Sequence, residues 1–514
     1  MDVVELELLW SNLRSVVTEQ AKAMQRTAFS PVVREAGDLA YAIFDRRGRM
    51  VAQAETGTPG HINCLAFCGG FLVNMFEGRL QPGDVLVTND PWHGAGHTFD
   101  ITVFAPIFRN GKILCYLGST NHHTDIGGLG VSISSTDVHE EGLWIPPLKL
   151  YEAGKPNETL YALIRRNVRT PDLISGDLAA QVASAQRGGE AVIDMCERFG
   201  IEDIEDLSDA IIARSEKAMR DAIRTCKPGS FSGETRFDIT DSLTITLKST
   251  VHIDNEKGEV LIDFAGSSPQ VRHGINVVLN YTHAYSTFAV RSCLSPEIPN
   301  NHGSLLPIKV TAPEGTVVNC RYPAPVAARH MVGMYVPMPV LKALAQVVPE
   351  RVLAEGPGAP WTAQVVGERD DGLPFVSTQF SFAGGMGARY GKPGPAATAY
   401  PTGVGATPLE VIEADSPVVF RRREIMPGTG GRGRNHGGDG QIVAFQVRTS
   451  KPWMLNASPA GMKYAPEGLA GGQAGELGHF SINGQVRHAG GKSMLNPDDV
   501  VTLQTPGGAG YGAE

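Results

Sequence analysis

Residues 89–128, NDPWHGAGHTFDITVFAPIFRNGKILCYLGSTNHHTDIGG, hold four of the fourteen histidines of the chain together with several aspartates. The residues that could do chemistry are His93, His97, His122, His123, Asp90, Asp100 and Asp125. Imidazole nitrogen combined with carboxylate oxygen suits a borderline divalent ion such as Zn²⁺, Mn²⁺ or Fe²⁺. These residue types therefore indicate a metal site, provided that the fold brings the two ends of the segment together.

A β-hairpin in the middle of the segment would bring them together. Asn-Gly at 110–111 lies between two apolar runs and is the strongest short signal for a two-residue type I′ turn. If Arg109 opposes Lys112, Asp100 faces Asn121 across the hairpin. Opposed positions lie about 5 Å apart. The open end of the hairpin then gathers His97, Asp100, His122, His123 and Asp125.

The predicted metal ligands are His97, Asp100 and His122. Two histidines and one carboxylate leave coordination positions open for water and substrate, which is typical of a catalytic site. His123 and Asp125 are predicted to be catalytic as proton carriers, or else to orient the ligands or add a fourth one. The alternative is a hydrogen-bond network that closes glycine-rich turns without an ion.

The hairpin strands carry apolar residues on both faces, which predicts a buried and rigid mount for the site. Pro106 predicts that the first strand is bulged or lies at an edge there.

Other acidic and imidazole groups could reach the same place. The carboxylates of Glu35 and Asp38 are three residues apart, and so are those of Glu410 and Glu413. Each pair could lie beside a metal, although a cap or an ion pair is the more common role. His61 follows a turn, and its side chain points either into a cleft at the predicted metal site or away from it.

The composition excludes several classes of protein. The net charge is −9 over 514 residues and no block of lysine or arginine occurs, which argues against nucleic acid or an anionic membrane as partner. No run approaches the roughly eighteen apolar residues of a membrane span. Seven dispersed cysteines without a signal peptide indicate reduced thiols in the cytoplasm.

Periodicity predicts an α+β chain with β-hairpins, mixed sheets and many glycine turns. The expected elements are a helix at 4–28, a hairpin at 39–53, helices within 170–226, alternating strands from 229 to about 330, a short helix at 334–348, and glycine-rich strands to the end. We expect three domains. They are an N-terminal α+β domain at 1–228 with the metal site, a mostly β domain at 229–350, and a glycine-rich β domain at 351–514.

Two glycine-rich segments invite a phosphate-binding interpretation. Residues 426–440, MPGTGGRGRNHGGDG, could bind an anion through backbone N–H groups with Arg432 and Arg434, but a tight glycine crossover with solvated arginines is favoured. HAGGKSM at 488–494 resembles the end of a phosphate loop, but Val486 stands where the first glycine belongs. We therefore expect this chain not to bind ATP.

Several longer motifs resemble the hydantoinase B/oxoprolinase family over essentially the whole chain. They include NDPWHGAGHTFDITVFAPIF, NHHTDIGG, EEGLWIPPLKLYEAG, GTGGRGRNHGGDG and TPGGAGYG. The resemblance implies a subunit that works with a hydantoinase A-type partner, which binds ATP and phosphorylates the substrate oxygen. It also implies a metal on His97, Asp100 and His122. Ala95 stands where the family often has glycine, which puts the size of the substrate in doubt.

Three functions remain open. The favoured one is the metal-dependent subunit of an ATP-dependent cyclic amide hydrolase of the hydantoinase, 5-oxoprolinase or lactamase type, acting on a small molecule within a hetero-oligomer. The second is a subunit of a carboxylase of the acetone or acetophenone type. The third is a noncatalytic scaffold for the A-type partner.

Overall fold

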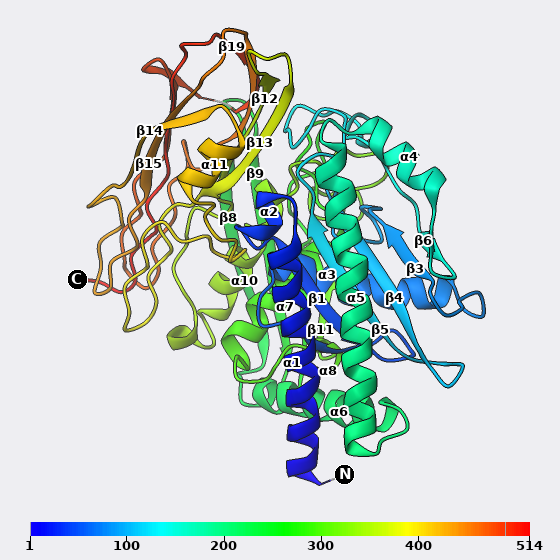
Figure 1. Cartoon of the computed structure of the whole chain (residues 1–514). Helices are drawn as coiled ribbons and strands as arrows, with labels where there is room; N and C mark the ends of the chain where they lie inside the picture. Colours follow the sequence, from blue (N-terminus) through cyan, green and yellow to red (C-terminus); the bar gives the residue numbers. More distant parts are fainter. Residues whose placement is uncertain (1, 489) are drawn as a thin grey trace.

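The computed structural model describes residues 2–488 and 490–514 and shows helices packed on four β-sheets, as the α+β prediction expected (Figure 1). The first sheet has the strand order β2-β1-β5-β4-β3-β6-β7. Its strands are β1 (Leu39–Phe44), β2 (Met50–Gln53), β3 (Val85–Thr88), β4 (Asp100–Arg109), β5 (Lys112–His122), β6 (Leu148–Glu152) and β7 (Lys155–Pro156). The predicted hairpins at 39–53 and 101–120 are therefore both present.

Helices cover both faces of this sheet. On one face α1 (Val3–Thr27) and α5 (Pro171–Phe199) run side by side against β1, β4 and β5, and on the other lies α3 (Pro59–Met75) (Figure 1). Along β1 the side chains alternate, so Tyr41 and Ile43 belong to the core with α1 while Ala42 packs with α3. Neighbouring residues of one strand therefore face two separate interiors.

The remaining helices of the N-terminal half are short or close the sheet edges. They are α2 (Pro31–Arg34), α4 (Glu158–Asn167) and α6 (Glu205–Arg224). Gly200 ends α5 in the left-handed region at φ 65°, as expected for a C-terminal cap.

The second sheet has the order β11-β10-β9-β8. It consists of β8 (Gly229–Asp238), β9 (Thr244–Asp254), β10 (Glu259–Asp263) and β11 (Ile308–Thr311), with α7 (Leu279–Leu294), α8 (His302–Leu305), α9 (His330–Gly333) and α10 (Pro337–Leu344). The expectation of strands up to about residue 330 is wrong at α7. This helix is buried on most sides, so it lacks a polar stripe, and its threonine, tyrosine and valine residues resemble a strand in composition.

The C-terminal part forms two sheets, ordered β13-β12-β16-β19 and β14-β15-β20-β17-β18 (Figure 1, yellow to red). Their strands are β12 (Trp361–Glu368), β13 (Pro374–Phe382), β14 (Val418–Ile425), β15 (Gln441–Val447), β16 (Trp453–Ser458), β17 (His479–Ile482), β18 (Gln485–Arg487), β19 (Gly491–Leu495) and β20 (Val501–Gln504), and α11 (Leu409–Asp415) precedes β14. Two short 3₁₀ turns, Val138–Glu140 and Pro349–Arg351, complete the described elements.

Glycine is required in this part because backbones lie in direct contact. A Cβ atom on Gly438 would lie 1.9 Å from the carbonyl oxygen of Pro395, and one on Gly508 would lie 2.2 Å from that of Met386. Arg432 and Arg434 are exposed beside these crossings, so the favoured crossover interpretation of residues 426–440 matches the structure. In the segment at 488–494, Ala489 lies outside the described residues, and Gly491 begins a strand where a phosphate loop needs a helix.

The strands of each sheet come from within one of the predicted ranges 1–228, 229–350 and 351–514. The largest apolar core nevertheless joins residues from all three, from Cys64 to Tyr511. The domain boundaries therefore stay a prediction. All seven cysteines are buried and free. Over residues 2–488 and 490–514, the helices lack the combination of length and apolar character that crossing a bilayer requires.

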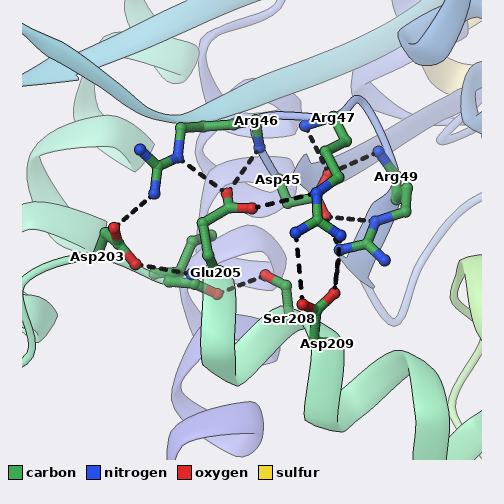
Figure 2. Close-up of polar contacts among 9 residues, drawn as sticks. Asp45, Arg46, Arg47, Arg49, Asp203, Glu205, Ser208 and Asp209 are labelled. Carbon is green, nitrogen blue, oxygen red and sulfur yellow. Dashed lines mark hydrogen bonds and ion pairs between the residues drawn. The ribbon is translucent and has the colours of Figure 1, made fainter.

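An ion cluster fixes the end of β1 that lies away from the histidine-rich segment (Figure 2). Asp45 is fully buried and accepts from the backbone N–H groups of Arg47 and Arg49, at 3.0 and 2.9 Å. Its other oxygen accepts from Nε of Arg49 at 2.6 Å, and Arg49 also reaches Asp209 on α6 at 2.5 Å. The β1–β2 turn is thereby fastened to α6.

We expect Asp45→Ala to lower the free energy of unfolding by about 2 kcal/mol or more, because two backbone donors and one arginine lose a buried acceptor. Asp209→Asn is the control, since its half-exposed ion pairs with Arg47 and Arg49 contribute less than about 1 kcal/mol each. Urea denaturation of the isolated chain measures both. Equal midpoints for the two variants would contradict this account.

Candidate metal centre

The pairing of β4 with β5 brings the predicted ligands into contact. Asp100, the first residue of β4, is the direct partner of His122, the last residue of β5. The sequence placed Asn121 opposite Asp100, which is wrong by one residue. A register shift at Ile107–Phe108, next to Pro106, adds the missing residue to one strand. The bulge therefore aligns a carboxylate with an imidazole.

His97 completes the group, which we call the ligand triad: His97, Asp100 and His122. Ligand atoms of all three lie within 4.8 Å of one another, and all three residues are buried. His97 lies in the turn that leads into β4, three residues before Asp100. The two histidine rings are 5.3 Å apart, centroid to centroid. Of the seven candidates at 89–128, these three meet at one point in space.

The geometry around His97 fits a cation. Its Nδ1 lies 3.0 Å from the carbonyl oxygen of Ala327, so the ring proton belongs on Nδ1 and the Nε2 lone pair faces the triad. Nε2 lies 3.0 Å from Oδ1 of Asp100, and neither atom makes a hydrogen bond with adequate geometry. Two acceptor atoms this close repel each other unless a positive charge lies between them. A divalent ion satisfies both.

The second oxygen of Asp100 is held by His61 and Arg329. Oδ2 lies 2.9 Å from Nε2 of His61 and forms an ion pair with Arg329. Burial alone raises the pKa of Asp100, but His61 and Arg329 outweigh it and hold the pKa well below its usual value. Asp100 is therefore ionised and presents Oδ1 as a ligand atom.

Arg329 is itself buried and tightly placed. Its Nε donates to the carbonyl oxygen of Ala95 at 2.6 Å, and its guanidinium lies 4.0 Å from the centre of the Tyr281 ring. Gly96 permits this approach, because a Cβ there would lie 2.7 Å from Cδ of Arg329. Glycine in the GAGH motif thus admits the arginine to the site.

The histidines of the triad are in the form that binds metals. Burial lowers the pKa of His97, and the positive charge of Arg329 lowers it further. Burial also holds the pKa of His122 well below its usual value, against the opposing effect of Asp100. Both rings are therefore neutral near pH 7, and neutral imidazole is the coordinating form. Phe99 stacks on His122, with centroids 5.6 Å apart.

Asp38 provides a second buried carboxylate. It precedes β1, and its carbonyl oxygen accepts from the backbone N–H of His122 at 3.1 Å. Oδ1 of Asp38 lies 3.4 Å from Nδ1 of His61, so His61 bridges the two carboxylates. Burial raises the pKa of Asp38 to about 6, although His61 acts in the opposite direction. Asp100 and Asp38 together raise the pKa of His61 against the effect of burial.

A cavity of about 40 Å³ opens onto these groups, enough for an ion with a few water molecules. Its walls come from all three predicted ranges of the chain. They are Asp38, Thr58, His61, His97, His122, Val131, Tyr281, Tyr285, Arg329, His330, Met334, Pro360, Thr362, Thr402 and Val404. The site therefore exists only when the N-terminal sheet, α7, α9 and the C-terminal sheets are assembled.

His123 and Asp125 lie apart from the triad. His123 directs its ring to α5, where Nε2 is 3.4 Å from Oε1 of Gln181. Asp125 binds Arg169 at 2.8 Å and accepts from the backbone N–H of Gly127 at 3.0 Å. Adjacent residues of an extended chain point in opposite directions, which separates His123 from His122.

The structure also places the other candidates. Asp38 and His61 face the cavity, whereas Glu35 pairs with Arg34. Glu413 accepts from the backbone N–H of Phe420 in β14 at 2.8 Å. Glu410 is exposed, and His93 pairs with Asp90 at 3.3 Å on the surface.

Sequence reasoning missed Arg329 and His330. Their only signal in the sequence is that arginine and histidine follow the apolar run APVAA. Nothing in the sequence indicates that this run lies beside a hairpin about 200 residues earlier.

Comparison with known proteins places the chain in a family. The family described as hydantoinase B/oxoprolinase matches residues 2–514. The chain belongs to the hydantoinase B/oxoprolinase family. It is 30% identical to the putative B-type subunit of a D-/L-hydantoinase of Pseudomonas sp. (strain NS671), covering 100% of this chain and 90% of that protein.

Two solved structures share the fold. The ATP-dependent caprolactamase from Pseudomonas jessenii superposes with a TM-score of 0.92 at 24% identity, covering 100% of this chain and 91% of that one. A nucleotide-free acetone carboxylase structure gives a TM-score of 0.89 at 18% identity, covering 99% of this chain and 75% of that one.

Asp38 makes the stability of the metal-free chain depend on pH. The folded state binds its proton more tightly than the unfolded chain, so this contribution is complete below about pH 4 and is lost as the pH rises through about 6. The full shift corresponds to roughly 3 kcal/mol. We expect Asp38→Asn to remove this dependence. Urea titrations of both proteins between pH 4 and 7 measure the difference, and parallel pH curves would contradict the assignment.

Proposed function

We propose that this chain is the metal-bearing subunit of an ATP-dependent enzyme that hydrolyses a cyclic amide activated by phosphorylation on an A-type partner. The observation that carries the proposal is the ligand triad, with Nε2 of His97 and Oδ1 of Asp100 facing each other at 3.0 Å beside a small cavity. The similar proteins include a component of a hydantoinase and an ATP-dependent caprolactamase, and their names support this reaction class.

His97, Asp100 and His122 would hold the ion, and Asp38 offers a further carboxylate on the same cavity. A divalent ion in such a site supplies Lewis acidity and lowers the pKa of water. The chain itself keeps both imidazoles neutral by burial and keeps Asp100 ionised through Arg329 and His61. Because Arg329 and His61 occupy Oδ2, Asp100 offers the ion only Oδ1.

The pair formed by Asp38 and His61 is placed to hold a proton at the cavity. The pKa of Asp38 lies near 6, and its carboxylate is 3.4 Å from the imidazole of His61. Groups that titrate near neutral pH are the effective ones in proton transfer. We therefore assign proton handling to this pair. His123 and Asp125, which face α5 and Arg169, would instead fix the segment that follows β5.

The small size of the metal cavity supports the assignment of ATP to the partner. At about 40 Å³ it is far smaller than the roughly 300–1,000 Å³ of sites that enclose drug-sized ligands. A triphosphate therefore does not fit beside the triad, which supports its use at a separate site. The similar hydantoinase protein is itself named as one subunit of its enzyme, which supports a hetero-oligomer.

We expect His97→Ala and His122→Ala each to weaken Zn²⁺ binding by more than about 100-fold, since losing only an outer partner of a ligand costs roughly 10–100-fold. Turnover of the assembled enzyme should be lost with the metal. His479→Ala, an exposed histidine on β17, is the control. Elemental analysis and competition with a zinc chelator measure binding. Wild-type metal content in His97→Ala would overturn the assignment.

The reaction class is tested with the assembled complex of this chain and an A-type partner. We expect hydantoins or lactams to stimulate ATP hydrolysis with release of the ring-opened amino acid. Stimulation by ketones only in the presence of bicarbonate would instead identify the carboxylase. Normal assembly without metal or substrate-stimulated ATP hydrolysis would identify a scaffold. Calorimetry on this chain alone should detect no ATP binding, and micromolar affinity there would contradict the division of roles.

A further inference from the structure

Residues 326–330, Val-Ala-Ala-Arg-His, form a segment that supports the ligand triad from outside, and we call it the strap. The carbonyl oxygen of Ala327 accepts the Nδ1 proton of His97 at 3.0 Å. Arg329 carries the ion pair to Asp100, and His330 lines the cavity. The position of the strap therefore decides which nitrogen of His97 faces the ion and which oxygen of Asp100 remains available.

One buried carboxyl group holds the start of the strap. Glu141 is fully buried, and its Oε1 accepts from the backbone N–H of Val326 and from Oγ of Ser135, both at 2.7 Å. Ser135 and Glu141 belong to the same loop, residues 131–142, so this single oxygen ties that loop to the strap. The loop also reaches the turn that carries His97, because the carbonyl oxygen of Glu141 accepts from Oγ1 of Thr98 at 3.3 Å.

The space around Glu141 is closed by backbone. Gly274 donates to the carbonyl oxygen of Ile133 at 3.1 Å and accepts from the N–H of Ala328 at 2.6 Å. A Cβ on Gly274 would lie 2.3 Å from Oγ of Ser135. The strap is thus held at two successive points, by Glu141 at Val326 and by Gly274 at Ala328. Movement of Glu141 would be transmitted to Ala327, which lies between them.

Burying Glu141 lowers the stability of the fold, so a purely structural role would not account for it. Among the described residues no lysine, arginine or histidine forms an ion pair with it, and Oε2 lacks a hydrogen-bond partner. Burial raises its pKa to about 8 despite the donors from Ser135, Ala327 and Val326. Buried carboxyl groups without a counter-charge destabilise the fold, so they concentrate at sites where their geometry serves a function.

We propose that Glu141 is a positioning residue of the metal centre: through the strap it fixes the Nδ1–H tautomer of His97 and thereby sets the affinity for the ion. The inference rests on the proposed function in that it takes the ligand triad to bind a divalent metal. It adds a residue 41 positions after Asp100 that touches no ligand atom of the triad.

The experiment compares four variants of the full chain. Glu141→Gln keeps an acceptor and the shape, Glu141→Asp withdraws the acceptor by one methylene, and Glu141→Leu removes it. Glu140→Gln is the matched control, because the neighbouring Glu140 is exposed and accepts from Thr136 at 2.7 Å. The two readouts are Zn²⁺ affinity by chelator competition and the tautomer of His97 in metal-free protein. The tautomer is read by NMR of ¹⁵N-histidine, assigned with His97→Gln.

We expect Glu141→Asp and Glu141→Leu to bind Zn²⁺ about 10–100-fold more weakly, as for loss of an outer partner of a ligand. Both should lose the single Nδ1–H signal of His97. Glu141→Gln should stay within about threefold of wild type, and Glu140→Gln should be unchanged.

A role confined to packing would lower the melting temperature of Glu141→Leu and leave the His97 signal and the Zn²⁺ affinity of the folded protein unchanged. That result would overturn the inference. If Glu141→Leu does not fold, Glu141→Asp decides the question by the same two readouts. A wild-type chain that binds no Zn²⁺ would defeat the proposed function instead, while the tautomer signal would still test Glu141.

Discussion

The carboxylate of Asp100 is the interaction on which the site depends. One oxygen is shared by Arg329 and His61, and the other faces Nε2 of His97 at 3.0 Å. A fully buried carboxylate would normally be protonated, since desolvation disfavours its charge. Arg329 and His61 reverse this and leave the other oxygen as an anionic ligand. Arg329 and His61 therefore keep Asp100 ionised through Oδ2, while Oδ1 is the atom that can bind an ion.

The first sheet likewise separates two sets of side chains, one on each face. β1 and β5 direct alternate side chains to two interiors, so Asp38 and His122 face the cavity while Tyr41 and His123 face α1 and α5. A one-residue slip would exchange these sets. The bulge beside Pro106 therefore matters for the chemistry, because it determines that His122, and not Asn121, lies opposite Asp100.

The dependence of the site on strand register and on contacts between distant segments explains which parts of it could be predicted from the sequence. The Asn-Gly turn located the hairpin and gathered the triad, because local turn chemistry and strand length suffice for that step. Register could not be obtained, since a bulge inserts one residue without a composition signal beyond proline. Arg329 and Glu141 could not be placed at all, because contacts across 229 and 185 residues depend on how separate sheets pack. α7 was missed for a related reason, as a helix buried on most sides shows no amphipathic period.

The cavity is assembled from distant parts of the chain, and this also accounts for the many glycines of the C-terminal sheets. Thr362, Thr402 and Val404 close the cavity from a region whose chains cross at backbone contact, with a Cβ on Gly438 only 1.9 Å from a carbonyl oxygen. Close crossings remove the side-chain layer that would otherwise separate these segments, so they pack backbone against backbone. The cavity of about 40 Å³ holds an ion with a few water molecules, so Thr362, Thr402 and Val404 limit what can lie beside the triad.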